Sequence, residues 1–157
     1  MRVGFGFDVH QLAEGRELRL GGIPVPHVKG AVGHSDADVL IHAICDALLG
    51  AANLGDIGKH FPDTSSEFKN IDSRILLKRV MEMVMHKKFV IENIDVTICL
   101  EKPKIAPHID AMKKSLSEVM KIDEDRISIK ATTNEKLGFI GREEGVACYA
   151  VVLLRNE

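Results

Sequence analysis

The sequence contains no tryptophan, and its aromatic residues are six phenylalanines and one tyrosine among 157 residues. The core must therefore be aliphatic, which fits a chain that is 45% hydrophobic. Only three cysteines occur, at Cys45, Cys99 and Cys148, and they lie far apart in the chain. An odd and scattered set is not a disulfide framework, so we expect reduced thiols in a cytoplasmic protein.

The chain also has little net charge, because its 21 Lys and Arg residues are nearly balanced by 23 Asp and Glu residues. This balance argues against a nucleic-acid partner, which requires clustered positive charge. The longest apolar run, Val146 to Leu154, is too short to span a bilayer and indicates a buried strand. Polar residues at 8, 10 and 11 interrupt the N-terminal segment, so no signal peptide is expected. We expect neither nucleic acid nor a membrane as partner.

No repeat, low-complexity tract or linker divides the sequence, so one domain over residues 1–157 is expected. Strand patterns occur at 2–12, 94–100, 127–131 and 145–154. In the first of these strands, Gly4 and Gly6 indicate a bend or a close approach to another element. Gly21 and Gly22 lie at the centre of a hairpin pattern over 17–26.

Helical spacing of apolar residues predicts three helices. The first covers residues 37–50 with Ser35 or Asp36 as its cap, the second follows Asp72, and the third covers 109–119. Residues 54–70 are rich in turn formers and predict a long, functional loop. The order of elements predicts an α/β fold of the α+β sandwich type, with one mixed or antiparallel sheet covered by three helices.

A metal-binding pattern is formed by Asp8, His10 and His42. Residues i and i+2 of a strand face the same side, so Asp8 and His10 can aim at one point. His42 lies in the first predicted helix, with Asp38 four residues before it and Asp46 four residues after it. Either carboxylate can accept a hydrogen bond from its second ring nitrogen. One carboxylate and two imidazoles with an open fourth position are typical of catalytic zinc.

Each part of this pattern has a simpler interpretation. Most isolated Asp-x-His pairs lie on the surface, and a single helical histidine is more often a core or capping residue. A structural zinc would need a fourth ligand, for which Cys45 is one turn from His42. We favour the open site, because a buried helical cysteine is usually a small apolar residue.

Several segments are suited to phosphate. Residues 33–36 precede a helix N-terminus, where free amides attract anions, and His34 can donate a hydrogen bond. Asp56 and Asp63 in the long loop are either ligands of substrate hydroxyls or turn residues. Lys102 and Lys104 lie at a strand end and suit a phosphate or a nucleotide, although a solvated loop explains them equally well.

Residues 131–139 form a further strand end that is rich in hydroxyl groups. The hydroxyl groups of Thr132 and Thr133 suit phosphate oxygens. Glu135 can hold Mg²⁺, which favours one or two carboxylates together with phosphate oxygens. From these patterns alone, the sequence predicts a metal-dependent enzyme acting on phosphates.

The motifs taken together are more specific than any one of them. They run in order through the chain: Gly6-Phe7-Asp8-Val9-His10, His34-Ser35-Asp36-Ala37-Asp38, His42, Asp46-Ala47-Leu48-Leu49-Gly50-Ala51, Gly55-Asp56-Ile57-Gly58, Phe61-Pro62-Asp63-Thr64, Ala131-Thr132-Thr133 and Glu135-Lys136-Leu137-Gly138-Phe139. In this order the chain resembles the 2-C-methyl-D-erythritol 2,4-cyclodiphosphate synthase family over nearly its whole length.

The resemblance implies a reaction in the non-mevalonate route to isoprenoid precursors. The 2-phosphate of 4-diphosphocytidyl-2-C-methyl-D-erythritol 2-phosphate attacks the β-phosphorus of the same molecule, and CMP leaves. It also implies a homotrimer whose sheets face a central axis and whose active sites are shared between subunits. Some members hold an isoprenoid diphosphate in the central cavity.

The resemblance also implies roles for individual residues. Asp8, His10 and His42 are expected to bind Zn²⁺, and Glu135 a second divalent ion, Mg²⁺ or Mn²⁺. His34 and Thr133 match positions that stabilise the transition state. Residues matching substrate-contacting positions are Asp8, His10, His34, Ser35, Asp56, Ile57, Gly58, Phe61, Pro62, Asp63, Thr64, Ser65, Leu100, Glu101, Lys102, Pro103, Lys104, Ile105, Ala106, Thr132, Thr133, Asn134, Glu135, Phe139 and Arg142.

The chain departs from the family pattern at three places: Ser65, Asn134 and the segment Leu100-Glu101-Lys102. They bear on loop contacts and leave the expected reaction unchanged. Two other functions use the same residues. A zinc phosphohydrolase would give a linear product, and a non-catalytic trimeric module would bind a nucleotide or an isoprenoid diphosphate.

Overall fold

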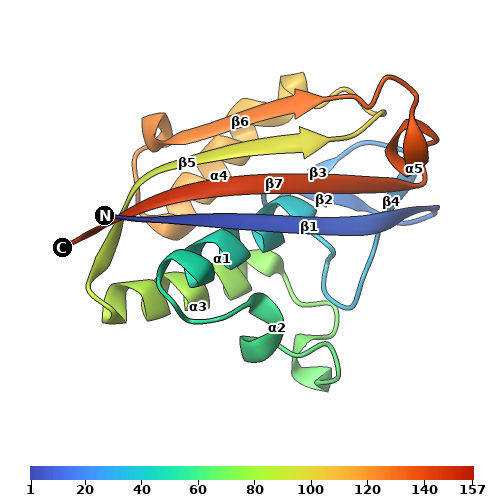
Figure 1. The fold of residues 1–157 in the computed structure, drawn as a ribbon. Helices are drawn as coiled ribbons and strands as arrows, with labels where there is room; N and C mark the ends of the chain where they lie inside the picture. The colour runs from blue at the N-terminus through green and yellow to red at the C-terminus, as the bar shows by residue number, and fades with distance from the viewer.

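A five-stranded mixed sheet forms the centre of the computed structural model, which describes residues 1–157 (Figure 1). The strands are β1 (Arg2–Glu14), β4 (Lys29–Val32), β5 (Phe89–Cys99), β6 (Ile127–Thr132) and β7 (Gly145–Asn156), in the spatial order β4-β1-β7-β5-β6. Only β5 and β6 pair in parallel. A separate hairpin contains β2 (Leu18–Leu20) and β3 (Ile23–Val25), where the sequence predicts one.

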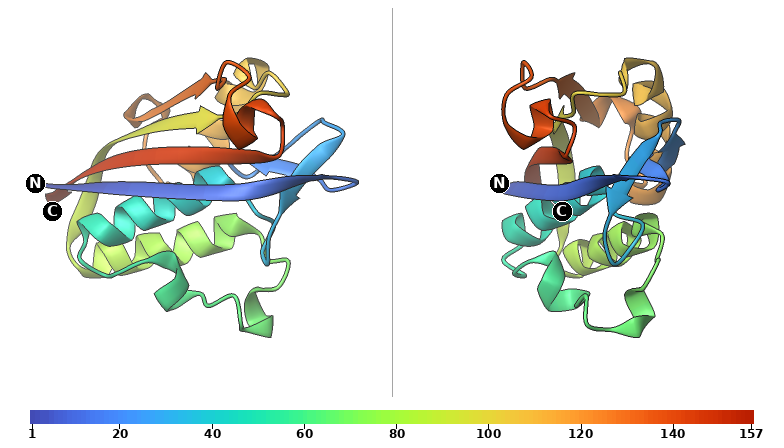
Figure 2. Two further views of the ribbon diagram at one scale, coloured as in Figure 1. Left: turned by 45° about the vertical axis from the view of Figure 1, so that its right-hand side comes forward. Right: turned by 90° about the vertical axis from the view of Figure 1, so that its right-hand side faces the viewer.

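The helices pack against this sheet, except that α2 contacts α1 instead, and α1 and α3 lie side by side (Figure 2). They are α1 (Val39–Ala51), α2 (Ile57–His60), α3 (Ser73–His86), α4 (Ile109–Met120) and α5 (Gly138–Gly141), with 3₁₀ turns at Ser66–Phe68, Ala106–His108 and Glu124–Arg126. The predicted mixed α/β architecture is confirmed. The predicted loop at 54–70 is partly helical, since it contains α2 and one 3₁₀ turn. No helix has the length and apolar character needed to cross a membrane.

Strand β1 lies unusually close to helix α1. A Cβ atom built on Gly6 would lie 1.9 Å from the carbonyl oxygen of Ala43, and one built on Gly4 would lie 1.9 Å from that of Ala47. Of the two sequence-based interpretations of these glycines, the structure therefore shows the close approach. The alanines on the helix and the glycines on the strand let two backbones come together without intervening side chains.

Helix α1 begins later than predicted. Its cap is Asp38, and Ala37 has a φ of 57°, which is incompatible with a helical turn. The Asp38 carboxylate accepts hydrogen bonds from the amides of Gly21 (3.0 Å), Gly22 (2.7 Å) and Ile41 (3.1 Å). Gly21 and Gly22 have φ values of 63° and 81°, which explains why glycine occupies the β2–β3 turn. Asp38 therefore joins the hairpin to the start of α1.

One face of β1 and β7 remains apolar and exposed. Side chains alternate along β1, so Gly4 and Gly6 face the helix while Phe5 and Phe7 face outward, 64% and 43% exposed. The ring of Tyr149 on β7 lies 5.0 Å from that of Phe7, centroid to centroid. An apolar surface of this kind marks a contact region.

Replacement of Gly6 by alanine tests the close approach. We expect Gly6→Ala to lower the free energy of unfolding by about 3 kcal/mol or more, because the added methyl group meets backbone that has to move. Gly50→Ala, in the helix that Gly6 contacts, is the matched control. Its Cβ meets no atom within 4 Å, and the change should raise helix stability by up to about 1 kcal/mol. Urea unfolding followed by circular dichroism measures both, and equal effects of the two changes would contradict the packing argument.

Candidate metal centre and active site

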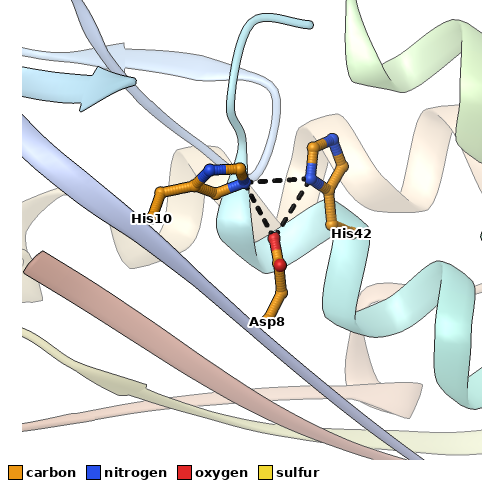
Figure 3. A group of neighbouring side chains, drawn as sticks. All are labelled: Asp8, His10 and His42. Atoms are coloured by element: carbon orange, nitrogen blue, oxygen red, sulfur yellow. Dashed lines mark hydrogen bonds and ion pairs between the residues drawn. The ribbon is translucent and has the colours of Figure 1, made fainter. Parts of the chain in front are cut away.

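Three side chains from β1 and α1 meet in a small triangle (Figure 3). Oδ2 of Asp8 lies 2.9 Å from Nε2 of His10 and 3.1 Å from Nδ1 of His42. The two histidine nitrogens are 3.2 Å apart. These are the three residues that the sequence predicts as metal ligands, and the structure brings them together.

The donor atoms fit a tetrahedral metal ion. Zinc bonds of about 2.0–2.1 Å place neighbouring ligand atoms roughly 3.3 Å apart, close to the spacing of these three atoms. Nδ1 of His10 lies 3.0 Å from the carbonyl oxygen of Val32, which can only accept, so the proton of this ring belongs on Nδ1. The lone pair of Nε2 then faces Asp8 and His42. One carboxylate and two imidazoles leave a fourth position for a ligand from outside the protein.

The charges in the triangle support cation binding. Burial by itself raises the pKa of Asp8, but the side-chain and charge interactions of its carboxylate with His10 and His42 outweigh it and lower the pKa to about 2. Burial lowers the pKa of His10, and the hydrogen bond and charge of Asp8 outweigh that effect and raise it. Asp8 therefore stays negatively charged at neutral pH, and a proton or a metal ion is attracted to the nitrogens beside it.

The predicted carboxylate partners of His42 are wrong. Its Nε2 atom lies 2.9 Å from Oγ of Ser73 and 3.1 Å from Oγ of Ser35. The side chain of Asp38 caps α1 and accepts hydrogen bonds from the β2–β3 turn. Asp46 accepts a hydrogen bond from the amide of Ile57 at 2.7 Å. Helical spacing placed both carboxylates near His42, but backbone amides are closer partners for them. Asp46 instead fixes the start of α2.

Burial at α1 agrees with one expectation and corrects another. Cys45 is fully buried in the hydrophobic core and does not belong to the metal-ligand group, so a structural zinc site finds no support. Val39 to Ile41 are also fully buried, and Asp38 caps them. The start of α1 is therefore covered and does not offer open amides to a phosphate.

A cavity of about 550 Å³ opens beside the triangle. Nine residues of its lining are among those predicted to contact the substrate: His10, His34, Ser35, Ile57, Gly58, Phe61, Pro62, Asp63 and Thr64. The others are His42, Gly33, Phe68 and Leu76. Figure 1 shows that α2 and the connection to α3 lie on the α1 side of the sheet. The predicted loop and the metal triangle thus form one site.

Hydrogen bonds hold this loop over the cavity. Nε2 of His34 donates to the carbonyl oxygen of Ser65 at 2.8 Å, and the amide of Asn70 donates to the carbonyl oxygen of His34 at 2.7 Å. His34 is therefore bound to the loop through one ring nitrogen. Asp56 is the cap of α2 and accepts the amide of Lys59 at 2.9 Å, so it has the turn role that the sequence left open.

A second cavity, of about 180 Å³, lies at the carboxyl ends of the parallel strands β5 and β6. It is lined by Leu100, Glu101, Pro103, Lys104, Ile105, Ala106, Ala131, Thr132 and Thr133. None of these residues lines the first cavity. The sequence-predicted nucleotide segment and the threonine-rich strand end therefore meet, at a place separate from the metal triangle of the same chain.

Two unusual sequence features are in contact at this second cavity. The carboxylate of Glu101 accepts the amide of Asn134 at 3.2 Å, and both positions depart from the family pattern. Thr133 Oγ accepts the amide of Glu135 at 3.4 Å, and the Glu135 side chain is exposed. Lys102 lies outside the cavity lining and pairs with Glu143 at 3.3 Å.

Phe139 and Arg142 lie near the end of β1. Phe139 shares a shallow hollow with His10 and Glu144, and Nε of Arg142 donates to Oε1 of Glu144 at 2.8 Å. The charge of Arg142 is thus balanced by its own neighbour.

Comparison with known proteins decides which family these features define. The model of the YgbB family matches residues 1–155. The chain belongs to the YgbB family. The 2-C-methyl-D-erythritol 2,4-cyclodiphosphate synthase of Bacteroides fragilis is 66% identical over 156 residues, which are 99% of this chain and 98% of that protein. The synthase of Prosthecochloris aestuarii is 59% identical and covers all of both chains.

Solved structures place this member of the YgbB family in the same fold. A 2-C-methyl-D-erythritol 2,4-cyclodiphosphate synthase in its CDP-bound form matches with a TM-score of 0.91 and 40% identity, covering 98% of this chain and 100% of that one. The bifunctional IspDF of Campylobacter jejuni matches with a TM-score of 0.96 and 45% identity, and this chain covers 42% of it. The family resemblance seen in the sequence motifs is confirmed.

Metal affinity in this YgbB-family protein should fall as the pH is lowered through the histidine range, about pH 8 to 5. The raised pKa of His10 lets a proton compete with the metal at higher pH than for an ordinary histidine, whereas Asp8, with a pKa of about 2, stays charged. Competition with a chromogenic chelator gives the zinc dissociation constant at each pH. A constant that changes only below about pH 4, where ordinary carboxylates titrate, would contradict this assignment.

Proposed function

We propose that this protein converts 4-diphosphocytidyl-2-C-methyl-D-erythritol 2-phosphate to 2-C-methyl-D-erythritol 2,4-cyclodiphosphate and CMP, in the non-mevalonate isoprenoid pathway. The observation that carries the proposal is the Asp8, His10 and His42 triangle beside a cavity of about 550 Å³, in a chain that matches the YgbB family from residue 1 to 155. Relatives at 59% and 66% identity bear the name of the enzyme for this reaction.

The chemistry needs charge balance and orientation more than it needs a base. The nucleophile is a phosphate oxygen that is already anionic. It forms a bond to the β-phosphorus, and the bond from that phosphorus to the bridging oxygen breaks, so that CMP leaves with the electron pair. Zn²⁺ held by Asp8, His10 and His42, with Mg²⁺ or Mn²⁺ near Glu135, supplies positive charge against the repulsion between phosphates.

The protein's own residues supply the geometry. The first cavity holds the erythritol and its phosphates against the triangle. There the free ring nitrogen of His34, Nδ1, faces the substrate, because Nε2 donates to Ser65. Thr133 donates a hydrogen bond to a phosphoryl oxygen. Residues 100–106, with Lys104, hold the cytidine and its phosphate in the second cavity. Bringing the two phosphates of one flexible substrate together is worth roughly 7–11 kcal/mol in favourable cases.

Assembly as a homotrimer would complete this site. The two cavities share no residue within one chain, and the exposed apolar face with Phe5, Phe7 and Tyr149 is suited to burial between subunits. In this arrangement the second cavity of one subunit faces the metal triangle of the next. An isoprenoid diphosphate in the central cavity would meet Phe139 and Arg142, and would have to compete with Glu144 for Arg142.

Product analysis tests the reaction. The purified protein with Zn²⁺ and Mg²⁺ should release CMP from the diphosphocytidyl substrate, and phosphorus NMR should show a cyclic diphosphate. His42→Ala should lower the rate by more than about a hundredfold, because the triangle loses a ligand. His86→Ala, on the exposed end of α3, is the control and should retain the rate. A linear product that contains solvent oxygen would favour a zinc phosphohydrolase instead.

A charge on the apolar face tests the assembly. Phe7→Glu should convert the trimer to monomers, as measured by light scattering, and should abolish CMP release. Burial of an unpaired carboxylate at this contact would destabilise the interface. Zinc content should persist, since Phe7 points away from the triangle. Met85→Glu, at a side chain that is 61% exposed on α3, is the control and should leave the mass unchanged. A Phe7→Glu protein that stays trimeric would refute this interface.

A further inference from the structure

The second ring nitrogen of His42 points away from the metal triangle, toward the start of α3. Its closest partner there is Oγ of Ser73, at 2.9 Å. Ser73 has no solvent-exposed surface, and Asp38 is the only other polar or charged residue that is buried. A buried hydroxyl of this kind requires hydrogen-bond partners, and the direction of its bonds fixes the protons of its neighbours.

The carboxylate of Asp36 sets the direction of these bonds. Its Oδ2 atom accepts the amide of Ser73 at 3.0 Å, and its Oδ1 atom accepts the Ser73 hydroxyl in a short hydrogen bond. An ionised carboxylate can only accept, so the hydroxyl proton belongs to the bond with Asp36. The lone pairs of Oγ are then left for His42, so in the hydrogen bond between Ser73 and His42 the Nε2 atom is the donor.

This direction determines which nitrogen of His42 can bind a metal. A neutral imidazole carries one proton, and with that proton on Nε2 the lone pair lies on Nδ1. Nδ1 is the atom that faces Asp8 and His10, at 3.1 and 3.2 Å. In metal sites, the hydrogen bond of the non-ligating nitrogen fixes the tautomer and the ring orientation.

Further contacts hold Asp36 in place. Oδ1 also accepts the amide of Asp38 at 3.2 Å, and Nε of Arg19 on β2 lies 3.7 Å from Oδ2. This Nε atom is buried and has no hydrogen-bond partner, so its positive charge is directed at the carboxylate. The chain of contacts runs from Arg19 through Asp36 and Ser73 to His42.

We propose that Ser73, held by Asp36, is a positioning residue that keeps His42 in the tautomer protonated at Nε2 and thereby presents Nδ1 to the metal ion. Two groups compete with Ser73: Oγ of Ser35 lies 3.1 Å from the same nitrogen, and the Asp8 carboxylate lies 3.1 Å from Nδ1 and would accept a proton carried there. Ser35 is only half-buried, faces the cavity and accepts the amide of Ala37, so it is free to turn to a ligand. The proposal deepens the metal site of the proposed function and rests on it.

The tautomer is measured in the metal-free protein, where neither zinc nor turnover contributes. Long-range proton–nitrogen NMR on protein labelled at histidine distinguishes the two tautomers, and the His42→Asn variant identifies the signals of His42. At alkaline pH the wild-type His42 should carry its proton on Nε2, and Ser73→Ala should give a mixture. A wild-type His42 protonated at Nδ1 would overturn the proposal.

Zinc affinity is the second measurement. Ser73→Ala should raise the zinc dissociation constant by about 10- to 100-fold, as for other outer partners of metal-bound histidines. Ser73→Thr keeps the hydroxyl and should restore most of the affinity, whereas Ser35→Ala should change it less. Unaltered affinity in Ser73→Ala would refute the role of Ser73. Heteronuclear spectra confirm that each variant is folded.

Asp36→Asn offers a sharper test that keeps Ser73 and its packing. Two backbone amides donate to the Asp36 carboxylate, and that of Ser73 is the closer. It should continue to donate to the side-chain oxygen of Asn, so the NH₂ group of Asn faces Oγ of Ser73 and donates to it. The hydroxyl proton is then free for Nε2 of His42, which should move the histidine proton to Nδ1 and weaken zinc binding. A His42 still protonated at Nε2 in this variant would contradict the chain of contacts. Absence of CMP release with these results intact would refute only the proposed function.

Discussion

The close contact of β1 with α1 is the constraint on which the rest of the site depends. Gly6 touches the carbonyl of Ala43, and the metal-binding residues lie directly beside this point of contact in both elements. Asp8 and His10 follow Gly6 on the same face of the strand, and His42 precedes Ala43 on the helix. Side chains of ordinary length can therefore converge within 3.2 Å because the two backbones are already in contact.

Buried polar groups then determine how these side chains are oriented. Asp38 and Ser73 are the only buried residues with polar side chains, and each lies at the start of a helix. Asp38 joins α1 to the β2–β3 turn, and Ser73 joins α3 to His42. A buried polar group without a hydrogen-bond partner destabilises the fold. An arrangement of these elements that separated Asp38 or Ser73 from its partners would therefore be less stable than the one observed.

Sequence patterns predicted those parts of the molecule that depend on neighbours along the chain. The two-residue period of a strand was enough to place Asp8 beside His10, and the glycine pair at 21 and 22 was enough for the hairpin. The start of α1 was misplaced because its cap depends on amides 16 and 17 residues away. The partner of His42 was missed for the same reason, since Ser73 is 31 residues distant. The reaction itself came from the family resemblance, because local spacing leaves several phosphate enzymes open.

The alternation along β1 has a consequence for how this gene can change. Even-numbered positions from Gly4 to His10 form the contact with α1 and the metal triangle, and odd-numbered positions from Val3 to Val9 form the apolar outer face. Loss or gain of a single codon in this strand would exchange the two sets, exposing the ligands and driving aromatic rings against the helix. The strand can therefore change by substitution but not in length, and selection on the metal chemistry and selection on the outer surface act together on the same eight residues.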